Sequence, residues 1–355
     1  MKILFITSSF YPKIGGLEKS VFSTARELSK RGNHVSIVTL NHDNLAEKEH
    51  FNEGFEVYRI PRSKIPYTGM LSKWKWFLFH FKLIKKVDII HFHDYNVFIN
   101  WFFPYRFIFL KKKYYITFHG YEGYPIRYKH IFFRKISVLF THGNICVGEF
   151  IKRWYRTKPD EIFYAAVDTE NITKRIDKGN NILFLGRLEK DTEILNYLKA
   201  LKLFYKKTGS SIPLYILGEG SLSKEVKSFL ENNNIPHKLL GIQQEHIAVI
   251  KKSSLVLTSS YLSIIESLAQ GKLVIAFYSN NLKREYLKSF PDSDAVMCIT
   301  ENINEVANII EKIIKEPLYY KDKIDSGLLL SKKLTWSKVA DKYISLYNKQ
   351  KTNES

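Results

Sequence analysis

The sequence predicts an α/β fold with two doubly wound parallel sheets. Residues 2–40 supply the first observation, because they read as a strand, a glycine-bearing loop, an amphipathic helix and a second strand. A strand that returns through a helix to another parallel strand is the repeating unit of such sheets. The second observation is that strands and helices alternate again after residue 181, and 355 residues are enough for two domains of ordinary size.

Apolar runs of strand length recur through both halves of the chain. In the first half the predicted strands are Lys2–Ser9, His34–Leu40, Glu56–Arg59, Asp88–His93, Tyr114–Phe118 and Asn144–Val147. In the second half they are Ile182–Leu185, Pro213–Leu217, His237–Leu240, Leu255–Thr258 and Leu273–Phe277, with helices at Thr192–Thr208, Leu222–Asn232, Gln243–Lys251, Ile264–Ala269 and Ile303–Lys315. The polar, non-periodic stretch Asn171–Asn181 predicts the linker between the halves.

The composition restricts the partners and the compartment. Fifty-five lysines and arginines against 35 acidic residues give a formal charge of +20, which favours an anionic partner or reflects a general basic composition. Nucleic acid is disfavoured, because the sequence contains no known nucleic-acid-binding motif. Cys146 and Cys298 lie in apolar contexts, so we expect buried, reduced thiols. Without a recognisable signal peptide or an 18-residue uncharged run, we expect a cytoplasmic protein.

Gly15 and Gly16 follow the first strand and precede its helix. Glycines there can simply turn the chain. Their position at a helix N-terminus also allows a ligand to approach backbone N–H groups at the positive end of the helix dipole. This context favours a site for an anion or a sugar.

Short motifs follow one another along this scaffold in a fixed order. They are PKIGGLE with RELSKRGNHV, DIIHFH, TFHG, AAVD, LFLGRL, LYILGEG, IESLAQGKLVIA and TWSKVADKYISLY. This series resembles the retaining glycosyltransferases of family 4, which share the GT-B fold, from Lys2 to Tyr347. The resemblance implies two Rossmann-like domains facing across a cleft, with a last helix that crosses back to the first. We therefore expect an acceptor domain at 1–170 with helix 334–350, and a donor domain at 171–333.

The resemblance implies transfer of a sugar from a nucleotide-diphosphate donor, UDP- or GDP-linked, to an acceptor. In the donor domain, Arg187 of LFLGRL is placed to contact the diphosphate, where fixed cations stabilise the charge that grows as the sugar bond breaks. Lys190 is the next cation, although the family usually places this lysine about two residues later. Glu266, which we expect in the first turn of its helix, corresponds to the ribose-binding glutamate. Ser263 is a further donor-binding candidate.

The first domain supplies the remaining candidate residues, and the sequence departs from the family pattern at one position. His119 of TFHG corresponds to the family's active-site histidine, so we expect Arg187 and His119 to be catalytic. Glu18 is a weaker donor- or acceptor-binding candidate beside Gly15 and Gly16. The family's other glutamate, which contacts the donor sugar, would fall at Thr258, where the chain reads TSSYLS. Either this residue is replaced or the loop is about four residues shorter than in the family.

No metal or other cofactor is predicted. His91 and His93 alternate along one strand like a metal pair, but no cysteine or carboxylate cluster accompanies them. Asp292–Ser293–Asp294 mimics the Asp-x-Asp metal motif of another glycosyltransferase fold, and we interpret it as a solvated loop.

Two segments, 71–86 and 98–113, mix aromatic residues with lysines and arginines. Aromatic side chains favour the bilayer interface and cations favour its anionic head groups, whereas the alternative is that the aromatic residues fill the first domain's core. The mixture predicts peripheral binding to the cytoplasmic face of a membrane and a glycan or lipid-linked acceptor.

Two other functions stay open. A nucleotide-sugar isomerase of the same architecture would bind a similar donor, although it usually lacks the PKIGGLE opening. A degenerate glycosyltransferase that acts as a binding subunit would explain the missing glutamate at Thr258.

Overall fold

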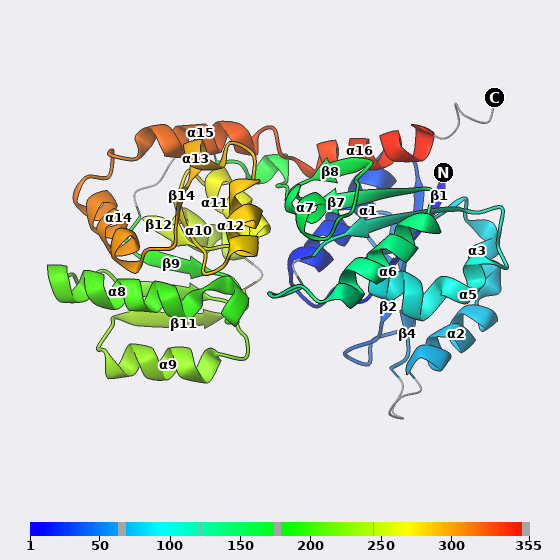
Figure 1. Ribbon diagram of the computed structural model, residues 1–355, viewed down its shortest axis with the longest axis horizontal. Helices are drawn as coiled ribbons and strands as arrows, with labels where there is room; N and C mark the ends of the chain where they lie inside the picture. The colour runs from blue at the N-terminus through cyan, green and yellow to red at the C-terminus, as the bar shows by residue number, and fades with distance from the viewer. Residues whose placement is uncertain (63–68, 121, 174–178, 244, 350–355) are drawn as a thin grey trace. The chain divides into compact units, whose positions relative to one another are not determined.

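A computed structural model describes residues 1–62, 69–120, 122–173, 179–243 and 245–349. The chain divides into two compact units, Met1–Phe163 with Trp336–Ser355, and Tyr164–Thr335 (Figure 1). The dividing point therefore lies before the expected domain boundary at residue 170, and part of the predicted linker, 174–178, lies outside the described residues. Each unit is built on a largely parallel sheet, as predicted.

The first unit contains an eight-stranded sheet in the order β3-β4-β2-β1-β5-β6-β7-β8. All neighbouring strands are parallel except β3 and β4, which form an antiparallel hairpin. The strands are β1 Lys2–Thr7, β2 His34–Leu40, β3 Lys48–Phe51, β4 Phe55–Ile60, β5 Ile89–His93, β6 Lys113–Phe118, β7 Gly143–Val147 and β8 Glu161–Phe163. Strands β3 and β8 were not predicted from the sequence, because β3 is mainly polar and β8 is only three residues long.

The helices of the first unit follow the same crossover pattern. They are α1 Gly16–Lys30, α2 Gly69–Phe79, α3 Phe81–Lys86, α4 Tyr95–Val97, α5 Phe103–Arg106, α6 Tyr128–Leu139, α7 Phe150–Trp154 and α16 Trp336–Lys349, with a π-helical turn at Phe98–Phe102. The predicted apolar face of α1 is buried through Val21, Ala25 and Leu28. Burial of such a stripe, rather than helix propensity, supplies most of a helix's stability in a protein.

The C-terminal helix α16 belongs to the first unit, as the predicted fold requires (Figure 1). Its predicted stripe is buried throughout, and it consists of Trp336, Val339, Ala340, Tyr343 and Leu346. Arg31, which follows α1, pairs with Asp341 at 2.7 Å, and Lys349 pairs with Glu161 of β8 at 2.5 Å. The helix is thus fixed both by apolar packing and by ion pairs at its edges.

The second unit contains a six-stranded parallel sheet in the order β11-β10-β9-β12-β13-β14. Its strands are β9 Ile182–Leu185, β10 Leu214–Leu217, β11 His237–Gly241, β12 Leu255–Leu257, β13 Leu273–Phe277 and β14 Cys298–Thr300. Its helices are α8 Ile194–Thr208, α9 Ser223–Asn232, α10 His246–Lys251, α11 Tyr261–Ala269, α12 Asn281–Lys288, α13 Ser293–Val296, α14 Ile303–Lys315 and α15 Lys321–Ser331. Short 3₁₀ turns lie at Thr169–Asn171 and Lys190–Thr192.

The two cysteines are free thiols, as expected, but they differ in burial. Cys146 on β7 is fully buried, whereas Cys298 at the start of β14 is only partly buried. The expectation of a buried thiol is therefore wrong for Cys298, which begins a strand at the edge of its sheet.

Candidate functional site

The loop after β1 places the glycine pair at the N-terminus of α1. Gly15 precedes the helix in an extended conformation, and the Glu18 carboxylate folds back over it. A methyl group on Gly15 would lie 2.6 Å from Glu18 Oε2, whereas one on Gly16 would meet open space. Glu18 therefore occupies the space over Gly15, and the open approach to the helix terminus lies at Gly16.

His119 follows β6 and is held by a second histidine. Its Nε2 atom lies 2.9 Å from Nδ1 of His93, the completely buried last residue of β5. Burial lowers the pKa of His119 to about 4, although the carboxylate of Asp94 opposes this shift. The imidazole is therefore neutral at pH 7, Nε2 is engaged by His93, and no described residue forms a hydrogen bond with Nδ1.

His91 lies on the same strand but serves a different purpose. Its Nε2 atom lies 2.7 Å from Thr117 Oγ1, and its Nδ1 atom lies 2.8 Å from the hydroxyl of Tyr347. Thr117 in turn contacts the hydroxyl of Tyr343 at 2.8 Å. Because both nitrogen atoms of His91 already have partners on β6 and α16, this histidine acts in packing rather than in metal binding.

A polar cluster that the sequence did not indicate surrounds His119. Arg134 of α6 is completely buried, donates to Glu122 Oε1 at 2.7 Å, and lies 4.2 Å from the ring centre of Tyr155. Glu122 Oε2 lies 2.5 Å from His130. Asp94, which immediately follows the DIIHFH motif, lies at the end of β5. Only Asp94 could have been noticed in the local sequence, because it directly follows the DIIHFH motif. Glu122, His130 and Arg134 come from α6 and the loop before it.

In the second unit, Arg187 lies on a loop fixed by close backbone packing. A methyl group on Gly218 would lie 2.0 Å from the Gly186 carbonyl oxygen, so the loops after β9 and β10 pack together only because a glycine is present. Leu188 N–H also donates to the Glu219 carbonyl at 2.9 Å. The Arg187 side chain is 69% exposed and pairs with Asp191 at 2.9 Å. A rigid loop thus presents a solvent-exposed cation at the carboxyl end of β9.

A lysine missed by the sequence lies near this arginine. Lys190 is exposed in the 3₁₀ turn after the loop, whereas Lys283 on α12 is 3% exposed. Burial lowers the pKa of Lys283 to about 8, while the negative charges of Asp191 and Glu193 oppose the shift. Because α12 follows β13, Lys283 also belongs to the carboxyl edge of the sheet. Nothing in its local sequence distinguishes it from a surface lysine.

Glu266 lies further along its helix than predicted. Helix α11 begins at Tyr261 rather than Ile264, so Glu266 is in the second turn and Ser263 is in the first. The Glu266 side chain is 8% exposed, and its Oε1 atom lies 3.1 Å from Nε2 of His246 on α10. The expected first-turn position is therefore wrong, because α11 begins three residues earlier than predicted.

That short loop contains Thr258, Ser259 and Ser260. Ser259 is tied into the core by hydrogen bonds to Tyr197 at 2.8 Å and to the Phe277 carbonyl at 2.8 Å. Thr258 is 1% exposed, and its hydroxyl has no hydrogen-bond partner in the described part of the chain. The loop therefore offers no carboxylate at the position that corresponds to the family's glutamate.

Comparison with known families identifies the chain. A model of Glycosyltransferase Family 4 matches residues 14–171, and a model of glycosyl transferases group 1 matches residues 168–353. The chain belongs to the glycosyl transferases group 1 family. An uncharacterized glycosyltransferase of Methanocaldococcus jannaschii is 24% identical to it over 366 residues, which cover 95% of each protein.

Solved structures extend this assignment to the fold of the glycosyltransferase. Sucrose-phosphate synthase of Thermosynechococcus elongatus matches with a TM-score of 0.77 at 16% identity, over 100% of both chains. The Anabaena protein HepE, in complex with UDP and glucose, matches with a TM-score of 0.74 at 14% identity, over 97% of this chain and 98% of its own. The predicted GT-B-like fold is confirmed.

The Asp292–Ser293–Asp294 segment of the glycosyltransferase is not the loop that we predicted. Asp292 precedes the short helix α13 with a φ of 51°, and Ser293 and Asp294 form its first turn. Asp294 pairs with Lys288 at 2.5 Å. Across the described residues, no group of three or more histidine, cysteine or acidic side chains is arranged to hold a metal ion.

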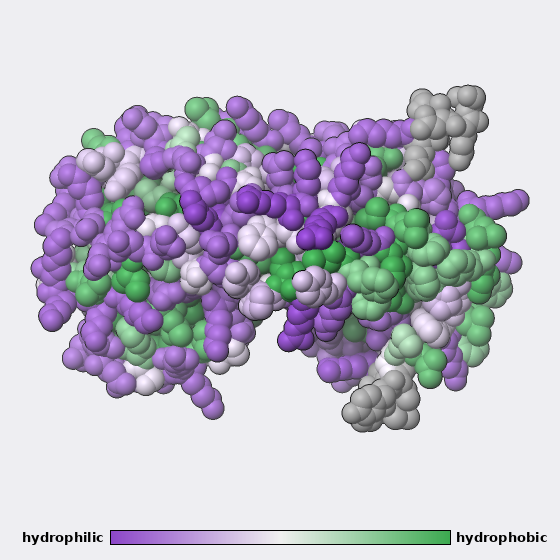
Figure 2. Space-filling view, viewed as in Figure 1, coloured by the Kyte–Doolittle hydropathy of each residue, from purple (hydrophilic) through white to green (hydrophobic). Residues whose placement is uncertain are grey.

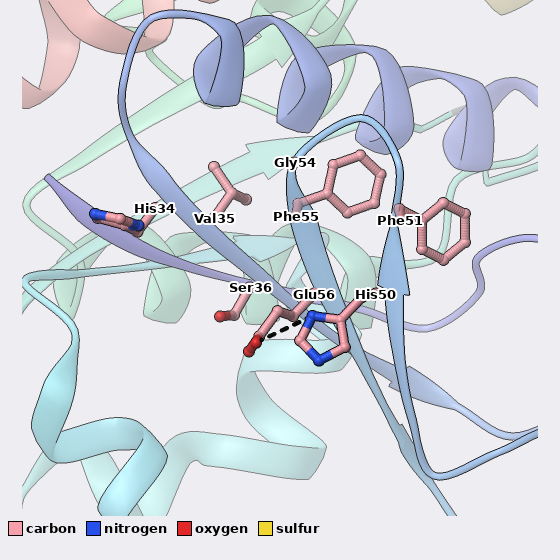
Figure 3. Close-up of a pocket in the computed structure, with 8 residues that line it drawn as sticks. All are labelled: His34, Val35, Ser36, His50, Phe51, Gly54, Phe55 and Glu56. Carbon is pink, nitrogen blue, oxygen red and sulfur yellow. Dashed lines mark ion pairs between the residues drawn. The ribbon is translucent and has the colours of Figure 1, made fainter.

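A hollow of about 430 Å³ lies at the amino ends of strands of the first sheet, opposite the edge where Gly16 and His119 lie (Figure 3). It is lined at the amino ends of β2 and β4 by His34, Phe55 and Glu56, and by His50 of β3, which lies 3.3 Å from Glu56. Gly16 and His119, by contrast, follow the carboxyl ends of parallel strands, where ligands of such sheets bind. We therefore place the candidate site at the carboxyl ends and not in this hollow.

The lowered pKa values of three histidines predict acid sensitivity of the glycosyltransferase. An unfolded histidine with a pKa near 6.5 binds a proton between pH 6.5 and 4, whereas folded His119, with a pKa of about 4, does not. Stability therefore falls as the pH is lowered through this range, by at most about 3 kcal/mol from His119. Burial also lowers the pKa of His91 and His93, which adds to the loss.

Urea denaturation at pH 7, 5.5 and 4.5 measures this effect. We expect the unfolding midpoint to decrease steadily, and the decrease to be smaller in His119→Asn, which cannot take up the proton. A midpoint that is independent of pH over this interval would contradict the neutral assignment of these histidines.

Proposed function

We propose that the protein transfers a sugar from a UDP- or GDP-linked donor to a glycan or lipid-linked acceptor, with retention of anomeric configuration. The observation that carries this proposal is the rigid loop that presents Arg187 at the carboxyl edge of the second sheet. Glu266 lies at the same edge and supplies a carboxylate that can accept two ribose hydroxyls. Binding of UDP and glucose by the structurally similar HepE supports a donor of this kind.

The residues of the two units take separate roles in the proposed reaction. Arg187 and Lys190, together with the buried charge of Lys283, stabilise the diphosphate as it leaves with the bonding electrons. Glu266 and Ser263 hold the nucleoside. In the first unit, the neutral His119 donates a hydrogen bond to the sugar or phosphate, and Gly16 opens the N-terminus of α1 to the ligand. The new bond forms as the acceptor oxygen replaces the phosphate oxygen on the anomeric carbon, and the proton of the acceptor hydroxyl passes to the departing diphosphate.

A thermal-shift screen against UDP, GDP, ADP and their sugars tests the donor class. A ligand that binds only the folded protein raises its melting temperature, by an amount that grows with concentration. We expect a UDP- or GDP-linked sugar to raise it most. Product analysis without an acceptor then separates a transferase from an isomerase, and binding without any donor turnover would favour the binding subunit that the Thr258 loop suggests.

Sugar transfer is expected to proceed without a metal ion. Arg187 and Lys283 supply fixed positive charges that in other enzymes come from a divalent cation. Activity should be unchanged after dialysis against EDTA. Activity lost in EDTA and restored by a divalent cation would contradict this expectation and direct attention back to Asp292 and Asp294.

A mixed apolar and basic surface on the first unit supports the membrane proposal. Trp76 and Phe77 of the predicted segment are buried core residues, which corrects part of the expectation, but other side chains are exposed. We define the apolar–basic face by the exposed residues Leu71, Leu78, Phe79, Phe107, Ile108 and Leu110, and the exposed lysines Lys75, Lys82, Lys85, Lys86 and Lys111. Figure 2 shows hydrophobic side chains gathered over α3, α5 and α6 on this unit.

The parts of the apolar–basic face are physically connected. Lys112 donates to the Lys85 carbonyl at 2.7 Å, which joins the segment after α5 to α3. Lys75 lies 5.8 Å from the ring centre of Phe79, so cations and apolar groups alternate at the surface. None of the described helices is long and apolar enough to cross a bilayer. We propose that this face binds the cytoplasmic surface of an anionic membrane, which brings a lipid-linked acceptor within reach.

Liposome flotation tests this proposal. Anionic vesicles at low salt should carry the protein upward, and high salt should release it, because each lysine near the surface adds roughly 1 kcal/mol that salt screens. Leu78→Ser with Phe79→Ser should abolish flotation. The matched control is Leu318→Ser with Tyr319→Ser, two similarly exposed residues of the second unit. Wild-type protein that stays with the soluble fraction at low salt would contradict the membrane proposal.

A further inference from the structure

Asp94 has a backbone conformation that is normally reserved for glycine. At the end of β5 its φ is 83° and its ψ is 152°. A side chain in this region clashes with the neighbouring backbone, so non-glycine residues occupy it only where the surrounding structure imposes it, and such positions cluster at functional sites. A residue that only ended the strand would be a glycine here.

The contacts of Asp94 hold its carboxylate in one position. Its N–H donates to the Thr117 carbonyl at 2.8 Å, and its Oδ1 atom accepts from Tyr95 N–H at 2.9 Å. Oδ2 accepts no hydrogen bond within the described part of the chain. A methyl group on Gly120 would lie 3.7 Å from this oxygen, so Oδ2 faces the residue that follows His119.

The surroundings of this oxygen favour an external hydrogen-bond donor. Asp94, His119 and Gly120 are only partly buried, whereas Arg134 beside them is completely buried. The Nε and Nη1 atoms of Arg134 have no hydrogen-bond partner in the described chain, so unpaired donors as well as the Asp94 oxygen lie at the carboxyl ends of β5 and β6. A carboxylate oxygen can only accept, and a sugar presents many hydroxyl donors.

We propose that Asp94 Oδ2 accepts a hydrogen bond from a sugar hydroxyl group, either on the transferred sugar or on a glycan acceptor. This inference rests on the proposed function. Asp94 then binds and orients the sugar beside His119, and the strained backbone is the consequence of aiming its carboxylate into the site. A hydrogen bond to a carboxylate is stronger than one between neutral groups.

Three variants separate this role from a structural one. Asp94→Gly relieves the backbone strain, so we expect it to melt at or above the temperature of the wild type. Asp94→Asn keeps the strain and the oxygen that accepts from Tyr95, but places an amide group where Oδ2 was. Asp292→Gly is the matched control, because Asp292 also precedes a helix with a positive φ. A clear fall in the melting temperature of Asp94→Gly would overturn the argument from strain.

Enzyme assays then decide the role. For both Asp94 variants we expect kcat/KM to fall by roughly 10- to 100-fold, with UDP affinity unchanged and Asp292→Gly fully active. If activity already falls in the hydrolysis of the nucleotide sugar without an acceptor, the hydroxyl group is on the transferred sugar. Loss only in transfer to an added glycan places it on the acceptor. Wild-type levels in both assays would overturn this inference alone, whereas an inactive wild type contradicts the proposed function and this inference with it.

Discussion

Replacing His119 by alanine is expected to lower the turnover of the nucleotide-sugar donor by roughly 100- to 1000-fold. The neutral imidazole is fixed by His93 at 2.9 Å, so its remaining nitrogen is already oriented when the ligand arrives. A preorganised donor stabilises charge that develops as the sugar–phosphate bond breaks, and it contributes little to the ground state. Donor affinity should therefore change by less than about threefold, because the loss falls mainly on kcat.

The measurement is the rate of donor consumption as a function of donor concentration, which separates kcat from KM. His50→Ala is the matched control, since it removes a histidine of the same unit that lines the hollow at the opposite edge of the sheet. We expect this control to be fully active. Normal turnover in folded His119→Ala would remove the histidine from the reaction, and a loss in His50→Ala would move the site to the hollow.

The strands of both sheets could be predicted because parallel strands buried on two faces leave continuous apolar runs. His34–Leu40, Ile182–Leu185 and Leu273–Phe277 occur with the predicted bounds. The polar hairpin strand β3 and the three-residue strand β14 lack such a run, and their extended conformation depends on pairing with a neighbouring strand. Local sequence carries no record of that pairing.

Candidate residues at strand ends could be predicted from the sequence because topology brings those ends to one edge within each sheet. Arg187, His119 and Gly16 follow β9, β6 and β1 in this way. Their partners were not accessible. His246 reaches Glu266 from a different helix, Lys283 is buried by packing of α12, and Arg134 reaches the loop after β6 from α6. Their sequence contexts resemble ordinary surface helices, and only tertiary structure distinguishes them.

The start of α11 also could not be predicted from the local sequence. We expected Glu266 in a first turn because the apolar run begins at Ile264. The helix begins earlier because the Tyr286 hydroxyl accepts the Tyr261 N–H at 2.8 Å, and the two rings stack 3.8 Å apart. A side chain 25 residues away thus satisfies a terminal N–H group that local capping residues normally satisfy.

Arg187→Ala and Glu266→Ala are each expected to weaken donor binding by roughly 10- to 100-fold, which corresponds to about 1.5–3 kcal/mol for a hydrogen bond to a charged group. Arg187 is already paired with Asp191, so the diphosphate must compete for the guanidinium group, and Asp191→Asn should strengthen donor binding modestly. For Glu266 the loss should be equal with UDP and with the nucleotide sugar, because the ribose is common to both.

Isothermal titration with UDP and UMP distinguishes these contacts. Loss of Arg187 should weaken UDP binding more than UMP binding, since only UDP carries the second phosphate, whereas loss of Glu266 should weaken both alike. Lys227→Ala is the matched control, because it removes an exposed ion pair with Glu231 at the same spacing along the chain as Arg187 and Asp191. Unchanged UDP affinity in folded Arg187→Ala would remove the diphosphate assignment, and equal losses with UDP and UMP would place this arginine at the first phosphate instead.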